Sequence, residues 1–283
     1  MNIDAKTELY GIIGWPVGHS LSPAMHNAAF GHFGLNACYV PLPVPPESLA
    51  QAAEGVRAFG FRGVNVTVPH KVEIIDYLDG LEGYAEELSA VNVIRRNDDT
   101  LTGLNTDVDG FRLSLEEAGV EVAGKRVVMI GAGGAGRSVV RALQDARAGE
   151  VIIMNRTHAK AEAVASAAGA PEVRAVRFSD NEAIYLLRDC AILINATSLG
   201  LKEADPAPLE TSFVHEGQTL VDLIYRPAKT RFLAEGEMRG ARIVNGYGML
   251  VFQAREAFKI WTGLTPPVSL MWDAGIKELD QGR

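Results

Sequence analysis

A lysine follows a short apolar run in the segment from Gly63 to Lys71, which reads GVNVTVPHK. The β-branched residues of this run predict a buried strand, and Pro69 is typical of the first turn of a helix. Thr67 and Lys71 would then lie where a strand ends and a helix begins, where free backbone N–H groups often bind ligands. A lysine held there is a candidate proton donor. The alternative is a solvated cation at the start of a helix.

An acid that could serve this lysine is Asp107, which lies farther along the chain. A carboxylate beside Lys71 would keep the ammonium group protonated and in place, ready to deliver a proton to an alkoxide. Asp107 could equally act with Thr106 as a helix N-cap. The histidines next to the candidate loops are interpreted as structural: His19, His26 and His70.

Two hydroxyl groups come from a loop near the start of the chain, those of Ser20 and Ser22. In an extended loop, side chains two residues apart point the same way, so this pair could hold a carboxylate without a full counter-charge. Ser22 precedes Pro23 and could instead cap a helix that begins there, which would leave Ser20 in a turn. Both interpretations stay open on the sequence alone.

A strand expected at 126–130 is followed by the pattern G-x-G-x-x-G, with glycines at 131, 133 and 136, and then by a helix. In this context the pattern predicts dinucleotide binding. The first glycine makes a tight turn, the second lets the backbone approach a pyrophosphate, and the third lets helix and strand pack closely. The phosphates would then lie at a helix N-terminus, where free N–H groups favour anions.

The tip of the next expected strand indicates which dinucleotide binds. An acid there would bond the ribose 2′-hydroxyl of NAD, but the chain has Arg156, whose planar guanidinium suits a 2′-phosphate. Thr157 adds a hydroxyl and Lys160 a further positive charge. The alternative is that Arg156 is an ordinary surface cation. We expect NADP rather than NAD, and a nicotinamide cofactor implies that hydride transfer is paired with proton transfer.

The elements that must position these residues alternate between strand and helix, which is typical of an α/β protein. The first block is expected to have strands at 9–14, 37–42, 63–68 and 90–95, and helices at 23–33, 47–59 and 69–79. Residues 101–107 are expected to cross into the second block, with strands at 126–130, 151–154, 190–194, 219–223 and 241–244, and helices at 108–118, about 138–146 and 158–168. Helices at 248–262 and about 269–279 close the chain.

The length, charge and composition of the chain argue against several classes of function. The 283 residues suffice for two domains, and the formal net charge of −8 argues against nucleic acid or an anionic membrane as the main partner. The two cysteines, Cys38 and Cys190, are expected to be buried and reduced, and no Cys/His spacing suggests a metal site. The N-terminus lacks the pattern of a signal peptide and no apolar run reaches the length of a membrane span, so we expect a cytoplasmic protein.

Ordered motifs run along essentially the whole chain. They are GWPVGHSLSPAMHN at 14–27, NVTVPHK at 65–71, AVN at 90–92, NTD at 105–107, GAGGA at 131–135, NRT at 155–157, NATS at 195–198, D-x-x-Y-x-P at 222–227 and NG-x-x-ML-x-x-Q at 245–253. Together these motifs resemble those of the shikimate dehydrogenase family. The resemblance implies reversible NADP-dependent reduction of 3-dehydroshikimate to shikimate, a step toward chorismate and the aromatic amino acids. It implies an N-terminal α/β substrate domain with a mostly parallel sheet, a Rossmann-type doubly wound nucleotide domain, and an active site in the cleft.

The same resemblance implies roles for particular residues. Lys71 would be the catalytic acid/base, paired with Asp107. The residues contacting the substrate would be Ser20, Ser22, Thr67, Asn92, Asp107, Tyr225 and Gln253. The residues contacting the cofactor would be Gly131, Ala132, Gly133, Gly134, Ala135, Asn155, Arg156, Thr157, His158, Ala159, Lys160, Leu223 and Gly246. The substrate domain would comprise 1–104 with the helices at about 247–283, and the NADP domain 105–246.

Two alternatives compete with this interpretation. Some members of the family also oxidise quinate and accept NAD, but the paired serines and the absence of an acid near Arg156 favour shikimate and NADP. A nucleotide-binding regulatory protein with a dead active site would be expected to have lost Lys71 and Asp107, and both are present. The expected partner is a small-molecule substrate, and the chain is expected to be a monomer or a homodimer.

Overall fold

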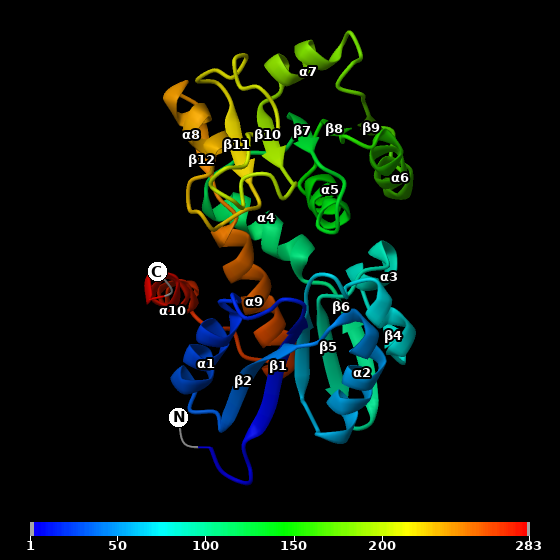
Figure 1. Cartoon of the computed structure of the whole chain (residues 1–283), viewed down its shortest axis with the longest axis vertical. Coiled ribbons are helices and arrows are strands. Elements are labelled where there is room, and N and C mark those ends of the chain that lie inside the picture. The colour runs from blue at the N-terminus through cyan, green and yellow to red at the C-terminus, as the bar shows by residue number, and fades with distance from the viewer. Residues whose placement is uncertain (1–2, 282–283) are drawn as a thin grey trace. The chain divides into compact units, whose positions relative to one another are not determined.

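The computed structural model describes residues 3–281 of the chain, and of Gln281 the backbone only (Figure 1). By internal packing the chain forms two units, which are described separately. Unit 1 comprises Met1–Gly110 with Val251–Arg283, and unit 2 comprises Phe111–Leu250. The helices α4 (Asp107–Glu117) and α9 (Tyr247–Thr262) each continue from one unit into the other.

Unit 1 is built on a six-stranded sheet in the order β2-β1-β3-β5-β6-β4. Its strands are β1 (Glu8–Gly14), β2 (Ala37–Pro43), β3 (Gly63–Val66), β4 (Gly80–Leu81), β5 (Val93–Asn97) and β6 (Thr100–Leu104). Only β5 runs antiparallel to its neighbours β3 and β6, and the other pairs are parallel. The expected mostly parallel sheet is confirmed.

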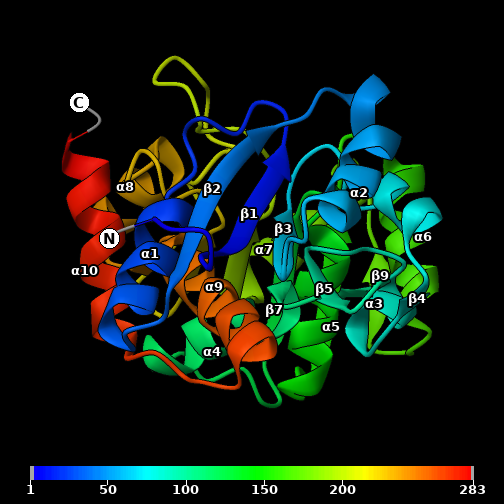
Figure 2. The ribbon, with the colours of Figure 1, turned by 90° about the horizontal axis from the view of Figure 1, so that it is seen from below.

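Alternate residues of the central strands feed two cores on the two faces of this sheet. On one face, Tyr10 and Ile12 of β1 pack with Phe30 of α1 (Ser22–His32) and Phe258 of α9. On the other face, Ile13 of β1 packs with α2 (Leu49–Ala58), the 3₁₀ helix η2 (Glu73–Tyr77) and α3 (Tyr84–Leu88). The last helix, α10 (Val268–Gln281), lies along α1 (Figure 2).

Helix α9 is seated on the sheet by Trp261, which lies directly over Gly63 of β3. A Cβ atom at Gly63 would collide with the indole ring, and the indole N–H donates to the carbonyl oxygen of Ile94 at 3.0 Å. Gly63 is therefore needed for the close approach of helix and strand.

Gly63→Ala should lower the stability of the chain by about 2 kcal/mol, because the indole must move and its hydrogen bond weakens. Thermal unfolding followed by circular dichroism measures the effect. The matched control is Gly31→Ala in α1, where an added Cβ meets no atom within 4 Å and alanine favours the helix. A Gly63→Ala variant that melts with the wild type would contradict this account of α9.

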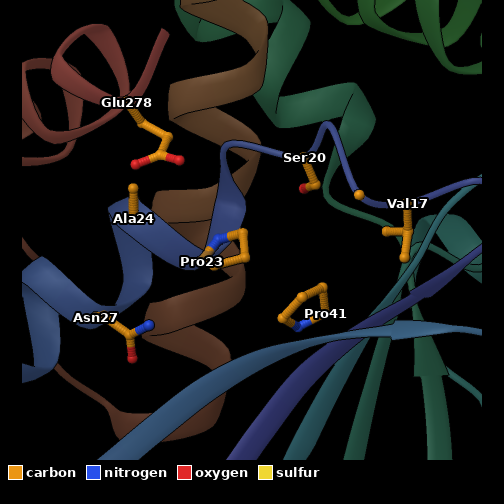
Figure 3. A pocket seen from close by; sticks show the side chains of 8 residues that line it. Val17, Ser20, Pro23, Ala24, Asn27, Pro41 and Glu278 are labelled. Atoms are coloured by element: carbon orange, nitrogen blue, oxygen red, sulfur yellow. The ribbon is translucent and has the colours of Figure 1, made fainter. Parts of the chain in front are cut away.

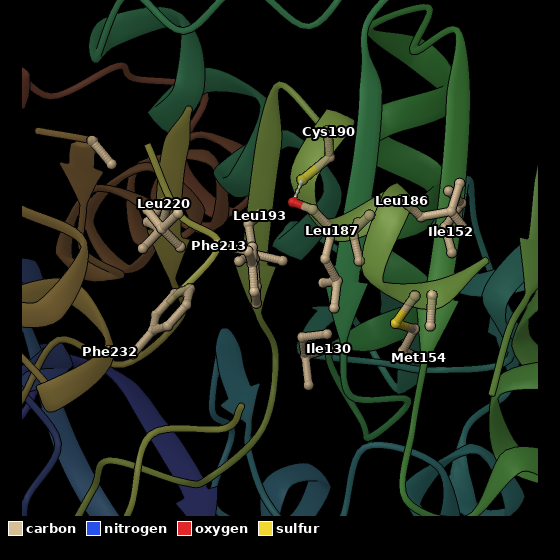
Figure 4. Packing of buried hydrophobic residues seen from close by; sticks show 14 of the residues in the cluster. Ile130, Ile152, Met154, Leu186, Leu187, Cys190, Leu193, Phe213, Leu220 and Phe232 are labelled. Carbon is tan, nitrogen blue, oxygen red and sulfur yellow. Dashed lines mark hydrogen bonds between the residues drawn. The ribbon is translucent and has the colours of Figure 1, made fainter. Parts of the chain in front are cut away.

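Unit 2 is built on a second six-stranded sheet whose strands are all parallel, in the order β12-β11-β10-β7-β8-β9. The strands are β7 (Arg126–Ile130), β8 (Glu150–Met154), β9 (Val173–Ala175), β10 (Ile192–Asn195), β11 (Thr219–Asp222) and β12 (Arg242–Val244), and the helices between them are α5 (Gly136–Asp145), α6 (His158–Ala168), α7 (Ala183–Asp189) and α8 (Arg231–Met238). Numbered from its own first strand, the order is 3-2-1-4-5-6, that of the doubly wound dinucleotide-binding fold. Its core joins residues of β7, β8, β10 and β11 to α7 and α8 (Figure 4).

The segment after β3 differs from its prediction. No α-helix begins at Pro69; residues 69–72 form turns that lead into η2. In a continuous helix the carbonyl of Lys71 would accept from the N–H of residue 75, but it accepts from the N–H of Val91 at 2.7 Å. The backbone of Lys71 is thus held by the segment just before β5.

Other element boundaries also needed correction. Residues 101–107 were expected to cross into the second block, but residues 101–104 belong to β6, which pairs with β5 through a hairpin. The strand expected from residue 90 begins at Val93, which leaves Asn92 outside the regular ladder. The helix expected at 47–59 divides into the 3₁₀ helix Pro46–Ser48 and α2. Short elements were not foreseen from the sequence: β4, α3, β9, α7 and α8.

Candidate functional site

Lys71 and Asp107 meet within unit 1. Lys71 lies in the turn after β3, and Asp107 is the first residue of α4. The Lys71 Nζ atom lies 2.6 Å from Asp107 Oδ2, and the two side chains are 21% and 7% exposed. The pair is thus partly sheltered from water, and Lys71 retains an accessible edge. A short charge-assisted bond of this kind holds the ammonium group in one place.

Asn92 fixes the other oxygen of the carboxylate. Its Nδ2 atom donates to Asp107 Oδ1 at 2.8 Å, while its Oδ1 atom accepts from the backbone N–H of Thr106 at 2.8 Å. The first N–H of α4 is satisfied by Asn105, whose Oδ1 atom accepts from Asp107 N at 2.9 Å. The Asp107 carboxylate is therefore not used as a helix cap, and both of its oxygens receive donors from the site.

Gln253 of α9 lies beside the same group of residues. Its Oε1 atom is 3.5 Å from Asn92 Nδ2, and its backbone carbonyl accepts from Thr106 Oγ1 at 3.0 Å. Thr106 was weighed in the sequence only as a helix cap, and here it bridges α4 to α9. Its position directly before Asp107 was the only signal in the sequence for such a role.

The two serines stand at the start of α1, in arrangements that differ from simple capping. Ser22 is the first residue of α1, and the N-cap position before it is occupied by Leu21. Ser20 Oγ instead accepts from the backbone N–H of Ser22 at 3.3 Å, which leaves its own O–H free to donate. Thr67, at the end of β3, packs its methyl group where a Cβ atom of Gly14 would otherwise be, so Gly14 permits this approach.

A pocket of about 280 Å³ opens on one side of the Ser20 loop, between α1, β2 and α10 (Figure 3). Its walls include Ser20, Pro23, Asn27 and Glu278. Neither Lys71 nor Asp107 lines it, so this hollow is separate from the lysine–aspartate pair.

The histidines near these loops do not contact the pair. His70 Nε2 lies 2.7 Å from the carbonyl oxygen of Val44, which is a structural bond. His26 is fully buried and stacks on Tyr39 with ring centroids 4.4 Å apart, and its ring nitrogens make no hydrogen bond. Burial lowers the pKa of His26 to about 3, so its ring is neutral. His19 is exposed.

The glycine loop of unit 2 has the form that a pyrophosphate needs. Gly131 has a φ of +109°, and a Cβ atom there would lie 2.8 Å from the backbone of Ala196. Gly133 and Gly134 are exposed, with open space where their side chains would be. At Gly136 an added Cβ would make only ordinary contacts of 3.7 Å, so the close packing of helix and strand expected to require this glycine is not found there.

The turn after β8 is tied to this loop by Asn155. Its Oδ1 atom accepts from Ala132 N at 3.3 Å and its Nδ2 atom donates to the carbonyl of Thr157 at 2.7 Å. Arg156 is exposed and has no carboxylate partner within residues 3–281, so its guanidinium is free to meet an anion. The rest of this segment leads into α6: Thr157, His158, Ala159 and Lys160.

The third part of the proposed cofactor site lies at the end of β11. Gly246 sits against the backbone of Leu223, where a Cβ atom would collide with the Leu223 carbonyl. Tyr225 follows in the same loop, and burial raises the pKa of its phenol, so its hydroxyl keeps its proton. Over the described part of the chain, no group of three or more His, Cys, Asp or Glu side chains could hold a metal ion.

A doubly wound sheet with a glycine loop and an unpaired arginine, together with a sheltered lysine–aspartate pair, defines a dinucleotide-dependent oxidoreductase. Comparison with known proteins specifies the class further. Three family models match in order: the shikimate dehydrogenase substrate binding domain at residues 12–94, shikimate/quinate 5-dehydrogenase at 113–213, and the shikimate 5′-dehydrogenase C-terminal domain at 246–274. The chain belongs to the shikimate dehydrogenase family.

Individual relatives agree along nearly their whole length. The NADP(+) shikimate dehydrogenase of Moorella thermoacetica is 44% identical over 275 residues, which is 96% of this chain and 93% of that protein. A shikimate dehydrogenase crystallised with NADP+ has a TM-score of 0.91 at 40% identity, covering 98% of this chain and 97% of that one. The Thermus thermophilus enzyme, crystallised with NADP(H) and shikimate, has a TM-score of 0.87 at 38% identity, covering 96% of this chain and 99% of that one.

These findings confirm the expected family and fold class. Among residues 3–281, no helix is both long and apolar enough to cross a membrane.

Proposed function

We propose that this chain catalyses the reversible NADPH-dependent reduction of 3-dehydroshikimate to shikimate, in the biosynthesis of chorismate and the aromatic amino acids. The observation that carries the proposal is the Lys71–Asp107 pair at 2.6 Å, in a chain that matches NADP-dependent shikimate dehydrogenases from end to end. Family membership supplies the substrate and the cofactor, and the pair supplies the proton that the reaction needs.

The cofactor, when bound, supplies the hydride that adds to the substrate carbonyl carbon. Lys71 Nζ donates a proton to the oxygen that becomes the new hydroxyl, and in the oxidising direction it takes that proton back. Asp107 holds the ammonium group in place through Oδ2, and Asn92 holds Asp107 through Oδ1. A proton donor fixed in this way is ready before the alkoxide forms, which is the condition for efficient acid catalysis.

The substrate is held, in this proposal, by hydroxyl, amide and carboxylate groups. Ser20 is suited to donate a hydrogen bond to the substrate carboxylate. Its Oγ atom accepts from the backbone N–H of Ser22, which leaves its own O–H free to donate. The residues proposed to contact the substrate are Ser20, Ser22, Thr67, Asn92, Asp107, Tyr225 and Gln253. The catalytic residues proposed are Lys71 and Asp107.

The cofactor is held, in this proposal, by unit 2. The open space at Gly133 and Gly134 fits a pyrophosphate at the start of α5, and the unpaired guanidinium of Arg156 fits a 2′-phosphate. The residues proposed to contact NADP are Gly131, Ala132, Gly133, Gly134, Ala135, Asn155, Arg156, Thr157, His158, Ala159, Lys160, Leu223 and Gly246.

Location and assembly belong to the same proposal. Cys38 and Cys190 are buried free thiols in different units, which favours a reducing compartment and hence the cytoplasm. We retain the expectation of a monomer or homodimer.

Steady-state rates with shikimate and quinate, each with NADP+ and NAD+, test the function. We expect shikimate with NADP+ to give a kcat/KM at least roughly tenfold above any other combination, because the paired serines favour shikimate and Arg156 stands where an acid would bond the ribose of NAD. Comparable efficiency with quinate and NAD+ would establish the dual-specificity alternative instead. No NADPH formation from shikimate would reject the proposal.

A further inference from the structure

Asp222 is a fully buried carboxylate at the C-terminal end of β11, and no cation lies beside it within the described residues. Its Oδ1 atom accepts from Asn195 Nδ2 at 3.1 Å and from the backbone N–H of Ile224 at 3.0 Å. Its Oδ2 atom accepts from Thr230 Oγ1 at 2.6 Å. Burying a carboxylate without a counter-charge costs free energy, so this arrangement needs an explanation other than stability.

In all three hydrogen bonds the Asp222 carboxylate is the acceptor. A backbone N–H can only donate, and Asn195 has its amide orientation fixed because its Oδ1 atom accepts from Thr197 N at 3.0 Å. Thr230 Oγ1 accepts from Leu233 N at 3.4 Å, so its own proton is available to Asp222. Three donors facing two oxygens is the pattern that suits an ionised carboxylate.

The three donors belong to three different segments of unit 2. Asn195 ends β10, Ile224 lies in the loop after β11, and Thr230 caps α8. The loop between Asp222 and Thr230 is therefore closed at both ends onto a single side chain. It is also held from the side, because the Ile224 carbonyl accepts from Gly246 N at 3.1 Å.

This loop carries two residues that the proposed function uses, Leu223 and Tyr225. The ring of Tyr225 rests edge-on against Tyr247, with centroids 6.4 Å apart. Within the described residues, neither side chain makes a hydrogen bond to the Asp222 carboxylate. A change at Asp222 would therefore reach the chemistry only by moving the loop.

We propose that Asp222 is a positioning residue for the dehydrogenase reaction, closing the loop 223–229 so that Tyr225 is presented to the substrate. The proposal rests on the proposed function and adds to it a residue that touches neither substrate nor cofactor. It also predicts that the role is lost when one oxygen of the carboxylate is replaced, even though the size of the side chain is kept.

Asp222→Asn is the variant that tests the proposal, because an amide of equal size cannot accept from all three donors. We expect kcat/KM for shikimate to fall at least roughly tenfold, as for a small displacement of a positioned group. The KM for NADP+ should change less than kcat/KM for shikimate, because the glycine loop and Arg156 are untouched and Leu223 is the one proposed NADP contact in the loop 223–229. The melting temperature should change by only a few degrees, because the loss of one of the three hydrogen bonds is offset by removal of a buried charge, the cost of which appears in the raised pKa of Asp222.

Asp205→Asn is the matched control. Asp205 also accepts from backbone N–H groups of a loop, those of Gly200 at 3.2 Å and Lys202 at 3.0 Å, but it is partly exposed and lies outside the loop 223–229. It should keep wild-type kcat/KM. An equal loss in both variants would mean that any loop carboxylate has this effect, and would overturn the specific role.

A double-mutant cycle with Tyr225→Phe separates positioning from a general structural role. If Asp222 acts through Tyr225, then Asp222→Asn should cost clearly less in the Tyr225→Phe background than in the wild type. Wild-type kcat/KM in Asp222→Asn, or losses that multiply fully in the double variant, would overturn the proposal. Failure of the wild type to use shikimate would instead overturn the proposed function, so the two failures are distinguishable.

Discussion

Lys71→Ala should lower kcat for the reduction of 3-dehydroshikimate by roughly 10²–10⁴-fold, the range expected when a positioned proton donor is lost. The Lys71 Nζ atom is held 2.6 Å from Asp107 and has no equivalent within the site. The groups proposed to bind the substrate remain in this variant, among them Ser20, Ser22, Thr67 and Asn92, so the KM for the substrate should change far less than kcat. Steady-state kinetics with saturating NADPH measure both parameters.

The matched control is Lys229→Ala. Lys229 also lies 2.6 Å from a carboxylate, that of Glu237, but both side chains are about half exposed and neither belongs to the site. This variant should retain wild-type kinetics. If Lys71→Ala retained most of its turnover, the acid/base role assigned to Lys71 would be wrong.

Arg156→Ala should raise the KM for NADP+ roughly ten- to hundredfold, the loss that corresponds to about 1.5–3 kcal/mol for hydrogen bonds to a charged group. The guanidinium is exposed and unpaired within residues 3–281, so its removal leaves no stranded carboxylate that would complicate the result. The KM for NAD+ provides the internal control, because NAD+ lacks the 2′-phosphate and should bind the variant almost as it binds the wild type.

An equal rise in KM for both cofactors would contradict a 2′-phosphate contact. It would indicate that Arg156 supports the turn after β8 in general. A second variant, Arg177→Ala, removes another exposed cation of unit 2 outside the site and should alter neither constant.

Much of the fold could be predicted from the sequence because its signals are local. Strand β7 and helix α6 have the expected bounds, since a compact apolar run and a stretch of alanines are read correctly without their neighbours. The turns at 69–72 could not be predicted, because the N–H of Val91 takes the carbonyl of Lys71 from twenty residues away in the sequence. A tertiary bond of this kind has no local signature.

The candidate site likewise has residues that local sequence signals predict and residues whose roles depend on tertiary contacts. A strand end, a glycine loop and a basic tip make Lys71, the loop at 131–136 and Arg156 candidates from residue types and spacing, and their roles stay predictions. The sequence left Asp107 equally plausible as a helix cap, and only the structure shows that Asn105 takes the capping role and frees the carboxylate. The sequence shows Asp222 only as the first residue of the D-x-x-Y-x-P motif. Its role in holding the loop could not be predicted, because its three hydrogen-bond donors come from separate segments.

The measurement that tests the central claim most directly is a single-turnover experiment on the wild type and Lys71→Ala, with enzyme and NADPH in excess over 3-dehydroshikimate. The loss of NADPH absorbance reports hydride transfer, and calorimetric titration with shikimate reports binding. We predict that binding changes by less than about threefold while the transfer rate falls by at least roughly a hundredfold. Transfer at the wild-type rate in the variant would contradict the claim that the Lys71–Asp107 pair supplies the proton.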